Sequence, residues 1–353
     1  MKKIRVLFIS PSLRSGGTEK IISYLYNNID RNYFDPKLLV IGFESENHYQ
    51  INGNNVVYLN KKRFRFSLFK IYANIMRGNH DIIFSSSFHI NIFLSLMSFF
   101  LSKRKMIIRE SSIFSGMKKY RKKSIIPFFI LKFFYNNIDR IIFQSSDMEK
   151  DFVTLFKLKG NYQIINNPVT FKREALNKNN HYKYFNILNV GSLERLKGHE
   201  RIISLLSNTK QNYRLTIYGS GSLEKELNML IVKLNLVNRI KLKGLTKKIY
   251  SILPNYNFFI QGSYVEGFPN VLIEALSYGL PCLVFKAPGG HNDIIIEGFN
   301  GFFIEEGMKE QKILNKFFSF NWDRESIQKD CFERFNSKKI ISQYEDLFIK
   351  IMK

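Results

Sequence analysis

Short apolar runs, each followed by a turn and a segment of helical length, recur along this chain, and that alternation restricts its fold more than any other feature. In the first half the runs occupy residues 4–10, 37–42, 55–59, 81–85, 105–109 and 139–145. Uninterrupted apolar runs of this length are typical of strands that helices cover on both faces. The alternation therefore predicts repeated βα units in a doubly wound parallel sheet. In such sheets ligands bind at the carboxyl ends of the strands.

A second series of runs indicates a second domain, because 353 residues are more than one hydrophobic core usually holds. After a polar, charged stretch at residues 172–185, strand-like runs resume at residues 185–192, 214–218, 239–244, 256–260 and 300–304. We therefore expect an α/β protein with two Rossmann-like domains, residues 1–168 and residues 183–337, joined by a linker. Residues 338–353 have the apolar spacing of an amphipathic helix.

The stretch at residues 261–279, QGSYVEGFPNVLIEALSYG, places two carboxylates beside a helix start. Glu266 is expected on the loop that follows a short buried strand, and Glu274 inside a helix whose first residue is Pro269. The apolar residues at positions 271, 272, 275 and 276 would give that helix one buried face. The backbone N–H groups at its start would form a ready anion site.

Glu266 and Glu274, eight positions apart in EGFPNVLIEAL, resemble the E-x7-E signature of retaining glycosyltransferases of the GT-B fold, most closely those of family 4. Two unrelated surface glutamates would explain the spacing but not the sequence around it. The resemblance implies two Rossmann-like domains facing across a cleft that holds a nucleotide-sugar donor, with the last helix returning to the first domain. It implies that Glu266 is catalytic and faces the transferred sugar, and that Glu274 binds the ribose hydroxyls, since a carboxylate is a double acceptor that suits a diol. The other donor contacts implied in this stretch are Phe268, Pro269, Asn270, Val271 and Leu272.

Two loops of the first domain carry further candidates. Gly16 and Gly17 follow the first strand, where glycine lets a backbone approach a phosphate closely, and Thr18 is a candidate N-cap. An ordinary strand-to-helix turn is the alternative, but GGTE resembles the GG-[TA]-E motif of family 4, which implies donor binding. His89 follows the fourth run. A lone histidine is more often a packed or capping residue, whereas the resemblance implies a catalytic position near the transferred sugar.

The loops of the second domain resemble the family's phosphate and nucleotide sites. The loop after the first strand of this domain resembles the motif G-R-L-x-x-x-K-G, with Lys197 in the place of the lysine. Ser192 stands where the family usually has arginine, and Arg195 is a candidate replacement from the same loop. Gly219 and Gly244 lie in turns that, in the family, hold the nucleobase and ribose.

The chain is strongly basic, with a net charge of +25 from 54 Lys and Arg against 29 Asp and Glu. Such an excess indicates a partner of negative charge, although an AT-rich coding sequence would explain part of it. Residues 61–77 and 117–135 mix Lys and Arg with Phe, Tyr and Ile, which suits an anionic membrane surface. A solvated basic face is the equally weighted alternative. We expect no nucleic acid partner, because no recognised binding motif accompanies the charge.

The compartment is expected to be the cytoplasm, with peripheral attachment to the inner face of the cell membrane. Two cysteines cannot build a disulfide framework, and nothing at the N-terminus resembles a signal peptide. No apolar run reaches the roughly 18 residues that a membrane-spanning helix needs. The longest, at residues 90–101, is interrupted by polar residues and predicts a buried helix.

The resemblance therefore implies a retaining glycosyltransferase of the hexosyltransferase type. It would move a sugar from a nucleotide-diphosphate donor, expected to be a UDP-sugar, to a lipid-linked saccharide acceptor during synthesis of a bacterial surface polysaccharide such as O-antigen, lipopolysaccharide or capsule. No cofactor and no divalent metal are expected, because the chain contains no Asp-x-Asp carboxylate pair. The alternatives are a sugar-nucleotide epimerase or phosphorylase of the same architecture, and a non-catalytic basic binding protein.

Overall fold

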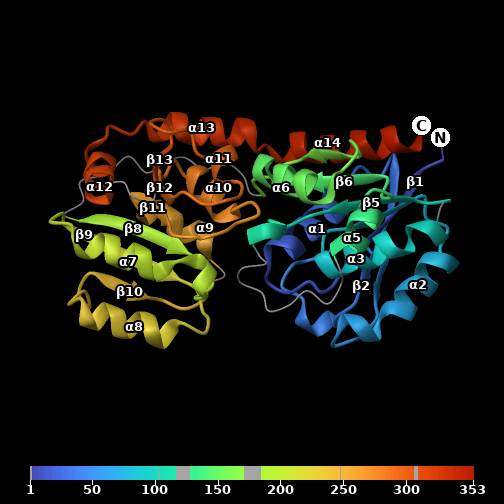
Figure 1. Ribbon diagram of the computed structural model, residues 1–353, viewed down its shortest axis with the longest axis horizontal. Coiled ribbons are helices and arrows are strands. Elements are labelled where there is room, and N and C mark those ends of the chain that lie inside the picture. Colours follow the sequence, from blue (N-terminus) through green and yellow to red (C-terminus); the bar gives the residue numbers. More distant parts are fainter. Residues whose placement is uncertain (1, 102, 117–127, 171–183, 247, 306–308) are drawn as a thin grey trace. The chain divides into compact units, whose positions relative to one another are not determined.

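The computed structural model describes residues 2–101, 103–116, 128–170, 184–246, 248–305 and 309–353 (Figure 1). The chain divides into two compact units. The first contains Met1–Thr170 and Ser337–Lys353, and the second contains Phe171–Asn336. Most of the expected linker at residues 172–185 lies outside the described residues.

The first unit is built on a seven-stranded sheet with the strand order β3-β2-β1-β4-β5-β6-β7, in which every neighbouring pair is parallel. Its strands are β1 (Ile4–Ser10), β2 (Phe34–Val40), β3 (Val56–Tyr58), β4 (Ile82–Ser85), β5 (Lys105–Arg109), β6 (Arg140–Phe143) and β7 (Tyr162–Ile164). Its helices are α1 (Gly17–Asn28), α2 (Leu68–Arg77), α3 (Phe88–Met97), α5 (Phe128–Tyr135), α6 (Ser146–Phe156) and α14 (Ser337–Met352), with short 3-10 turns η1 (Glu44–Glu46), η2 (Phe64–Phe66) and η3 (Ser98–Phe100). The buried helix expected at residues 90–101 is confirmed as α3 and η3.

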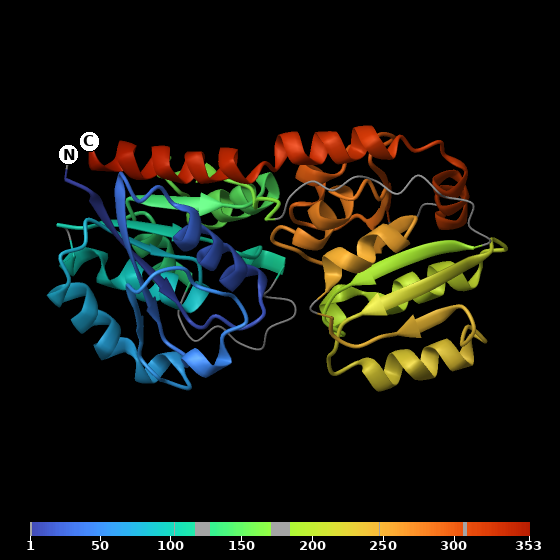
Figure 2. The same ribbon diagram turned by 180° about the vertical axis from the view of Figure 1, so that it is seen from behind.

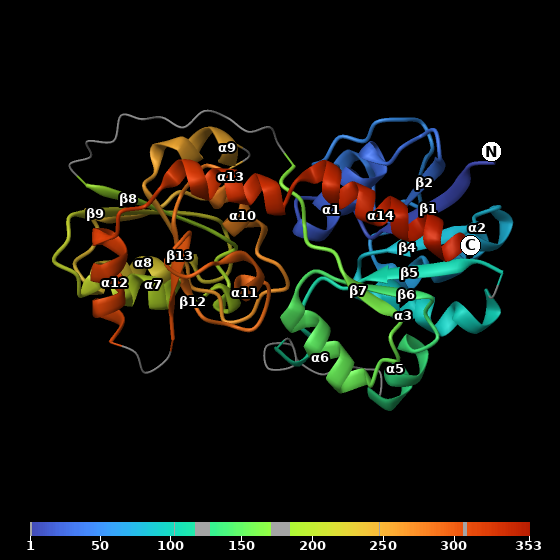
Figure 3. The same cartoon turned by 90° about the horizontal axis from the view of Figure 1, so that it is seen from above.

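The last helix of the chain belongs to the core of the first unit. Figures 1 and 3 show α14 lying along the first sheet, and it shares an apolar core with α1 and the central strands. Phe348 contacts the rings of Phe8 and Phe84 at centroid distances of 6.4 and 5.9 Å. Tyr344 accepts a hydrogen bond of 3.1 Å from Nε of Arg109, which is itself buried. The chain therefore returns to its first unit after completing the second.

The second unit is built on a six-stranded parallel sheet with the order β10-β9-β8-β11-β12-β13. Its strands are β8 (Phe185–Val190), β9 (Tyr213–Tyr218), β10 (Ile240–Leu242), β11 (Phe258–Gln261), β12 (Cys282–Phe285) and β13 (Gly301–Ile304). Its helices are α7 (His199–Ser207), α8 (Glu224–Lys233), α9 (Ile249–Ile252), α10 (Asn270–Leu276), α11 (His291–Ile294), α12 (Glu310–Ser319) and α13 (Arg324–Arg334), with the 3-10 turns η4 (Arg195–Lys197) and η5 (Leu253–Asn255). Figure 2 shows α8 beside β10 at one end of this sheet. Two doubly wound parallel sheets, as expected from the alternating runs, are thus confirmed.

Three local expectations were wrong. Thr18 is not an N-cap, because α1 already begins at Gly17 and Gly16 occupies the capping position. Pro269 is the N-cap of α10 and not its first residue. The helix α10 also buries more than the expected face, since Ile273 and Glu274 are buried along with Leu272, Ala275 and Leu276, whereas Val271 is half-buried. It is enclosed on several sides because it packs within the unit and not on its surface.

Candidate active site

The strand order of the second sheet reverses between β8 and β11. From β8 the chain continues through β9 to β10, and from β11 it continues in the opposite direction to β12 and β13. The loops that leave the carboxyl ends of β8 and β11 therefore start next to each other, which is where α/β sheets bind ligands. These two loops carry Lys197 and Glu266.

Two glycines let these loops touch. A Cβ atom added to Gly198 would lie 2.0 Å from the carbonyl oxygen of Gly262, and one added to Gly262 would lie 2.3 Å from the carbonyl oxygen of Gly198. Gly198 also has a φ of 58°, in the left-handed region that other residues rarely adopt. Because a side chain at either position would push the loops apart, the sequence brings Lys197 and Glu266 together by omitting side chains beside them.

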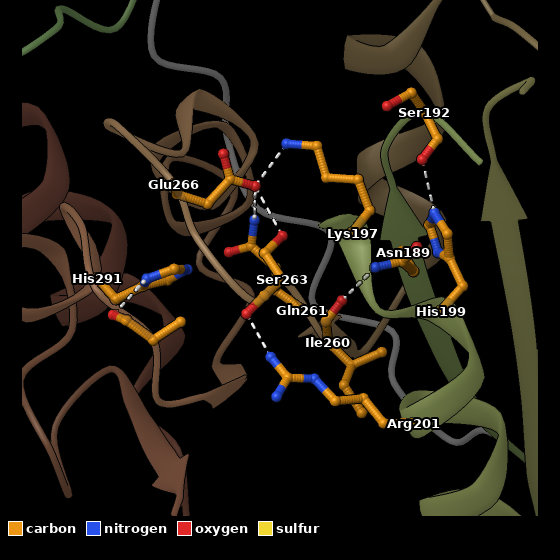
Figure 4. Close-up of polar contacts among 11 residues, drawn as sticks. Asn189, Ser192, Lys197, His199, Arg201, Ile260, Gln261, Ser263, Glu266 and His291 are labelled. Carbon is orange, nitrogen blue, oxygen red and sulfur yellow. Dashed lines mark hydrogen bonds and ion pairs between the residues drawn. The ribbon is translucent and has the colours of Figure 1, made fainter. Parts of the chain in front are cut away.

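The carboxylate of Glu266 is surrounded by hydrogen-bond donors, as Figure 4 shows. Its Oε1 atom accepts from Nζ of Lys197 at 2.5 Å, from Oγ of Ser263 at 2.7 Å and from Nε2 of Gln261 at 3.3 Å. The side chain of Glu266 is 11% exposed and that of Lys197 is 27% exposed. This is therefore a largely buried, charge-assisted contact.

Electrostatics keep Glu266 ionised in this environment. Burial by itself would raise the pKa of its carboxyl group, but the charge of Lys197 and the hydrogen bonds from Lys197 and Ser263 outweigh burial and hold that pKa below its usual value. The site thus contains a carboxylate that stays negative near neutral pH. This carboxylate can therefore supply a fixed negative charge or a hydrogen-bond acceptor to a reaction at this point.

A buried histidine, His291, lies near enough to this carboxylate to interact with its charge. Nδ1 of His291 lies 3.3 Å from the carbonyl oxygen of Ala287, so Nδ1 carries the proton that forms this bond. Nε2 of His291 and Oε1 of Gln261 are both buried and lack a hydrogen-bond partner among the described residues. Burial lowers the pKa of His291, and the nearby Glu266 offsets this only in part. His291 is therefore a neutral neighbour of Glu266 at neutral pH.

Residues 170–329, which carry Lys197, Glu266 and Glu274, match the family model described as Glycosyl transferases group 1. The matched residues make up most of the second unit, so it is this part of the chain that resembles a glycosyltransferase.

Two relatives of known sequence are named as glycosyltransferases. The chain is 32% identical over 206 residues to the uncharacterized glycosyltransferase MJ1059 of Methanocaldococcus jannaschii, an alignment that covers 55% of this chain and 50% of that protein. It thus spans about half the length of that relative. It is also 23% identical over 368 residues to the GalNAc-alpha-(1->4)-GalNAc-alpha-(1->3)-diNAcBac-PP-undecaprenol alpha-1,4-N-acetyl-D-galactosaminyltransferase of Campylobacter jejuni, covering 98% of this chain and 96% of that one.

A solved structure resembles the whole fold. The Anabaena protein Alr3699/HepE, in complex with UDP-glucose, has a TM-score of 0.79 and 17% sequence identity, over 98% of this chain and 100% of that chain. Together with the two parallel sheets, this likeness identifies the GT-B fold expected from the sequence.

Glu274 lies within α10 and is 8% exposed. Its Oε1 atom accepts a hydrogen bond of 3.3 Å from the hydroxyl of Tyr250. Phe268 is buried, as is Leu272 at the core side of α10. The N–H group of Leu272 donates to the carbonyl oxygen of Pro269 at 3.0 Å, so one of the backbone groups expected to be available at this helix start is already bonded.

Asn270 and Val271, the first two residues of α10, are half-buried.

The remaining candidates of the second unit line neighbouring loops at the same edge of its sheet. Ser192 and Arg195 are exposed in the loop after β8. Gly219 donates its backbone N–H to the carbonyl oxygen of Gly244 at 2.8 Å, which joins the loops after β9 and β10. A Cβ atom on Gly219 would lie 1.8 Å from the carbonyl oxygen of Gly191, so this position also depends on the absence of a side chain.

The candidates of the first unit lie at the carboxyl edge of the first sheet, where its own strand order reverses between β1 and β4. Gly16 and Gly17 stand at the start of α1, and the hydroxyl of Tyr49 bonds both the N–H and the carbonyl of Gly16, at 3.3 and 3.0 Å. His89 is exposed in the first turn of α3, with its ring centroid 6.3 Å from that of Phe64. These residues form a second group, which belongs to the first unit.

Sequence reasoning missed several polar neighbours of Glu266. Gln261 and Ser263 were within the stretch that drew attention, and their position at the carboxyl end of β11 was the available signal. Arg201 and His291 come from α7 and α11, far from Glu266 in the sequence, and no local pattern identifies them. Tyr250, the partner of Glu274, lies in the short helix α9 and likewise gives no sequence signal.

Within the described ranges, no cluster of three or more His, Cys, Asp or Glu side chains is arranged to hold a metal ion. Over the same part of the chain, no helix has both the length and the apolar character needed to cross a membrane.

Proposed function

We propose that this protein transfers a sugar from a UDP-sugar to a lipid-linked saccharide, with retention of configuration at the anomeric carbon. The observation that carries this proposal is the contact between Lys197 and Glu266 at the strand-order reversal of the second sheet. The pair combines a fixed anion with a cation in a place where ligands of α/β proteins bind. Both residues lie within the part of the chain that matches the glycosyl transferase family.

The reaction breaks the bond between the anomeric carbon and the donor's diphosphate oxygen, and forms a bond from that carbon to an acceptor oxygen. The acceptor hydroxyl loses its proton, and the nucleoside diphosphate leaves with an added negative charge. Stabilising charge that develops during a reaction is usually the largest contribution of the protein. Lys197 has three N–H donors, so its ammonium group can bind Glu266 and a departing phosphate oxygen together. Arg195, exposed in the same loop, would add a second cation.

Two glutamates would then orient the donor. Glu274 would accept hydrogen bonds from the two ribose hydroxyls, and its position beside Tyr250 fixes its carboxylate. Glu266, ionised and held by three donors, would face the sugar ring. His89 of the first unit would lie near the transferred sugar and assist catalysis, and Gly16 and Gly17 would contact the donor.

Relatives support the choice of substrates. Alr3699/HepE is in complex with UDP-glucose, and the Campylobacter jejuni relative is named for transfer to a PP-undecaprenol saccharide. A UDP-sugar and a lipid-diphosphate acceptor are therefore the substrates that we propose for this chain, in the synthesis of a surface polysaccharide of the O-antigen or capsule type. We further propose that no divalent metal takes part.

We also propose that the protein works at the cytoplasmic face of the membrane. Between residues 62 and 70, four basic and two aromatic side chains are exposed. Phe66 and Phe69 are exposed by 60% and 81%, and the basic residues are Lys62, Arg63, Arg65 and Lys70. The second basic segment expected at the membrane, residues 117–135, lies mostly outside the described residues. A basic and aromatic surface of this kind suits anionic head groups.

The decisive experiment is mass spectrometry of the products formed from a panel of UDP-sugars and synthetic polyprenyl-diphosphate saccharides. A product heavier than the acceptor by one sugar, with an α linkage by NMR from an α-linked donor, is expected. Consumption of donor without any acceptor would instead favour an epimerase, and dependence on free phosphate a phosphorylase. Tight UDP binding without turnover across the panel would favour a non-catalytic binding protein.

A further inference from the structure

Arg201, the third residue of α7, binds the backbone of the loop that carries Glu266. Its Nε donates to the carbonyl oxygen of Gly262, and its Nη2 donates to the carbonyl oxygen of Ser263. Figure 4 shows Arg201 below Ser263 in the view, with a dashed line between them, while the side chain of Lys197 reaches Glu266 from the right. A guanidinium group is a rigid, planar set of donors, so two bonds to successive carbonyls fix the path of the chain.

Aromatic rings fix the guanidinium group in turn. Its carbon lies 4.1 Å from the ring centroid of Tyr264 and 4.4 Å from that of Phe285. The hydroxyl of Tyr264 donates to Oε1 of Glu200 at 2.9 Å, which ties this ring back to α7. Arg201 is therefore held between β12 and the loop after β11, and its position leaves little freedom to the loop.

The segment that Arg201 binds, residues 261–263, also carries two of the hydrogen-bond donors to Glu266. Ser263 Oγ and Gln261 Nε2 both bond Oε1 of Glu266, and Gly262 lies between these two residues. A small displacement of residues 262–263 would move Ser263 and loosen the carboxylate from its donors. The loop also touches Gly198 through Gly262, so the displacement would reach Lys197 as well.

We propose that Arg201 is a positioning residue that holds residues 261–263 in the one path that keeps the Glu266 carboxylate against Lys197. This inference rests on the proposed role of Glu266 in sugar transfer. Arg201 itself acts through the loop and has no contact with substrate in the proposed reaction.

The first test needs no substrate, because it follows backbone amide exchange in the free protein. Arg201→Met keeps the aliphatic stem but removes both donors, whereas Arg201→Lys keeps the charge but places its N–H donors on a single nitrogen. We expect amides at positions 264 and 266 to exchange about tenfold faster in Arg201→Met, with a smaller change in Arg201→Lys. Arg214→Met is the matched control, because Arg214 also lies over a ring, that of Tyr184 at 4.2 Å, but sits on β9.

Two exchange results would overturn the inference. One is unchanged exchange at positions 264 and 266 in Arg201→Met. The other is a uniform rise over the whole second unit, which would make Arg201 a general stabilising residue.

The second test is a double-mutant cycle on UDP release from the UDP-sugar that the product panel identifies. Arg201→Met should lower kcat by about 10²-fold with a smaller change in KM, since it displaces a catalytic group without removing it. Added to Glu266→Gln, it should lower kcat by no more than about twofold, because residues that act as a unit are not additive. A full further loss in that background would show that Arg201 acts elsewhere. If Glu266→Gln alone has no effect, the proposed role of Glu266 fails, and the exchange experiment still decides whether Arg201 positions the loop.

Discussion

The Nζ atom of Lys197 lies 2.5 Å from Oε1 of Glu266, although 69 positions separate the two residues in the sequence. Glu266 would not hold its charge as well alone, because its side chain is largely removed from water and Lys197 supplies its counter-charge. The pair joins the loop after β8 to the loop after β11. Removing one partner therefore tests both the geometry and the electrostatics of the site.

Replacing Lys197 by methionine should leave Glu266 buried without its counter-charge. Burial would then dominate and raise the pKa of Glu266, so that any step needing its carboxylate would shift to higher pH. Turnover at neutral pH should fall by about 10²–10³-fold, the usual effect of losing one charge-stabilising donor. The pH profile of UDP release measures both effects. Lys243→Met, an exposed lysine after β10, is the control, and an unshifted profile in Lys197→Met would contradict the assignment.

Replacing Glu274 by alanine should weaken nucleotide binding and abolish turnover while the fold stays intact. Loss of charged hydrogen bonds to two ribose hydroxyls should raise the Kd for UDP by about 10- to 100-fold. Calorimetric titration with UDP gives this ratio, and circular dichroism checks the fold. Glu226→Ala, an exposed glutamate of α8, should bind UDP as the unaltered protein does. Equal affinity and rate in Glu274→Ala would remove this residue from the donor site.

The sequence predicted the strands well because a strand that is buried on both faces is a continuous run of apolar residues. β1, β4 and β5 are almost wholly buried, and each is a continuous apolar run. β7 was not predicted, because Tyr162 and Gln163 are half-buried and Ile164 is exposed at the edge of the sheet. An edge strand is held by backbone hydrogen bonds to its neighbour, and such bonds require no particular pattern of side chains in the sequence.

The site was predictable only where its residues lie close together in the chain. Glu266, Glu274 and the α10 start could be found because one short stretch contains them. The pairing of Glu266 with Lys197 depends on the strand order of the second sheet, which brings the loops after β8 and β11 together. The grip of Arg201 depends in addition on Gly198 and Gly262, whose missing side chains allow contact. Such contacts are consequences of topology and are not visible in local spacing.

Stability should fall as pH rises, because of a buried glutamate in the first unit. Glu110 accepts hydrogen bonds from Asn91 and Tyr135 at 2.9 and 2.8 Å, and burial raises its pKa to about 7 despite them. The unfolded chain loses this proton near about pH 4.3. Between the two values the folded protein holds a proton that the unfolded chain has lost. The free energy of unfolding should therefore fall by on the order of 3 kcal/mol from about pH 4.5 to pH 7.

Glu110→Gln should remove this dependence, since an amide keeps an acceptor for Asn91 and Tyr135 but has no proton to lose. Urea unfolding of the first unit across this pH range measures it. Glu44→Gln, at an exposed glutamate of η1, should keep the slope of the unaltered protein. The same slope in both variants would show that another group titrates.

Activity should not depend on a divalent metal. The proposed mechanism draws its positive charge from Lys197 and Arg195, and the chain contains no Asp-x-Asp pair. Glycosyl transfer should therefore proceed at its full rate in excess EDTA, and added Mg²⁺ or Mn²⁺ should not raise it. Loss of activity in EDTA that Mg²⁺ restores would contradict this prediction.

Membrane attachment should combine a charge-dependent part with a part that salt does not remove. Arg63, Arg65 and Lys70 are exposed near Phe66 and Phe69, and each cation near an anionic surface contributes on the order of 1 kcal/mol. Replacing the three cations by serine should weaken sedimentation with vesicles containing anionic lipid at low salt. Replacing the two phenylalanines should instead remove the binding that persists at high salt, because burial of rings among head groups is not screened. A matched triple replacement of Lys210, Lys225 and Lys241, exposed cations of the second unit, should leave binding unchanged. Equal binding to neutral and anionic vesicles, or equal losses in both triple variants, would show that the basic segment is a solvated face and not a membrane-binding surface.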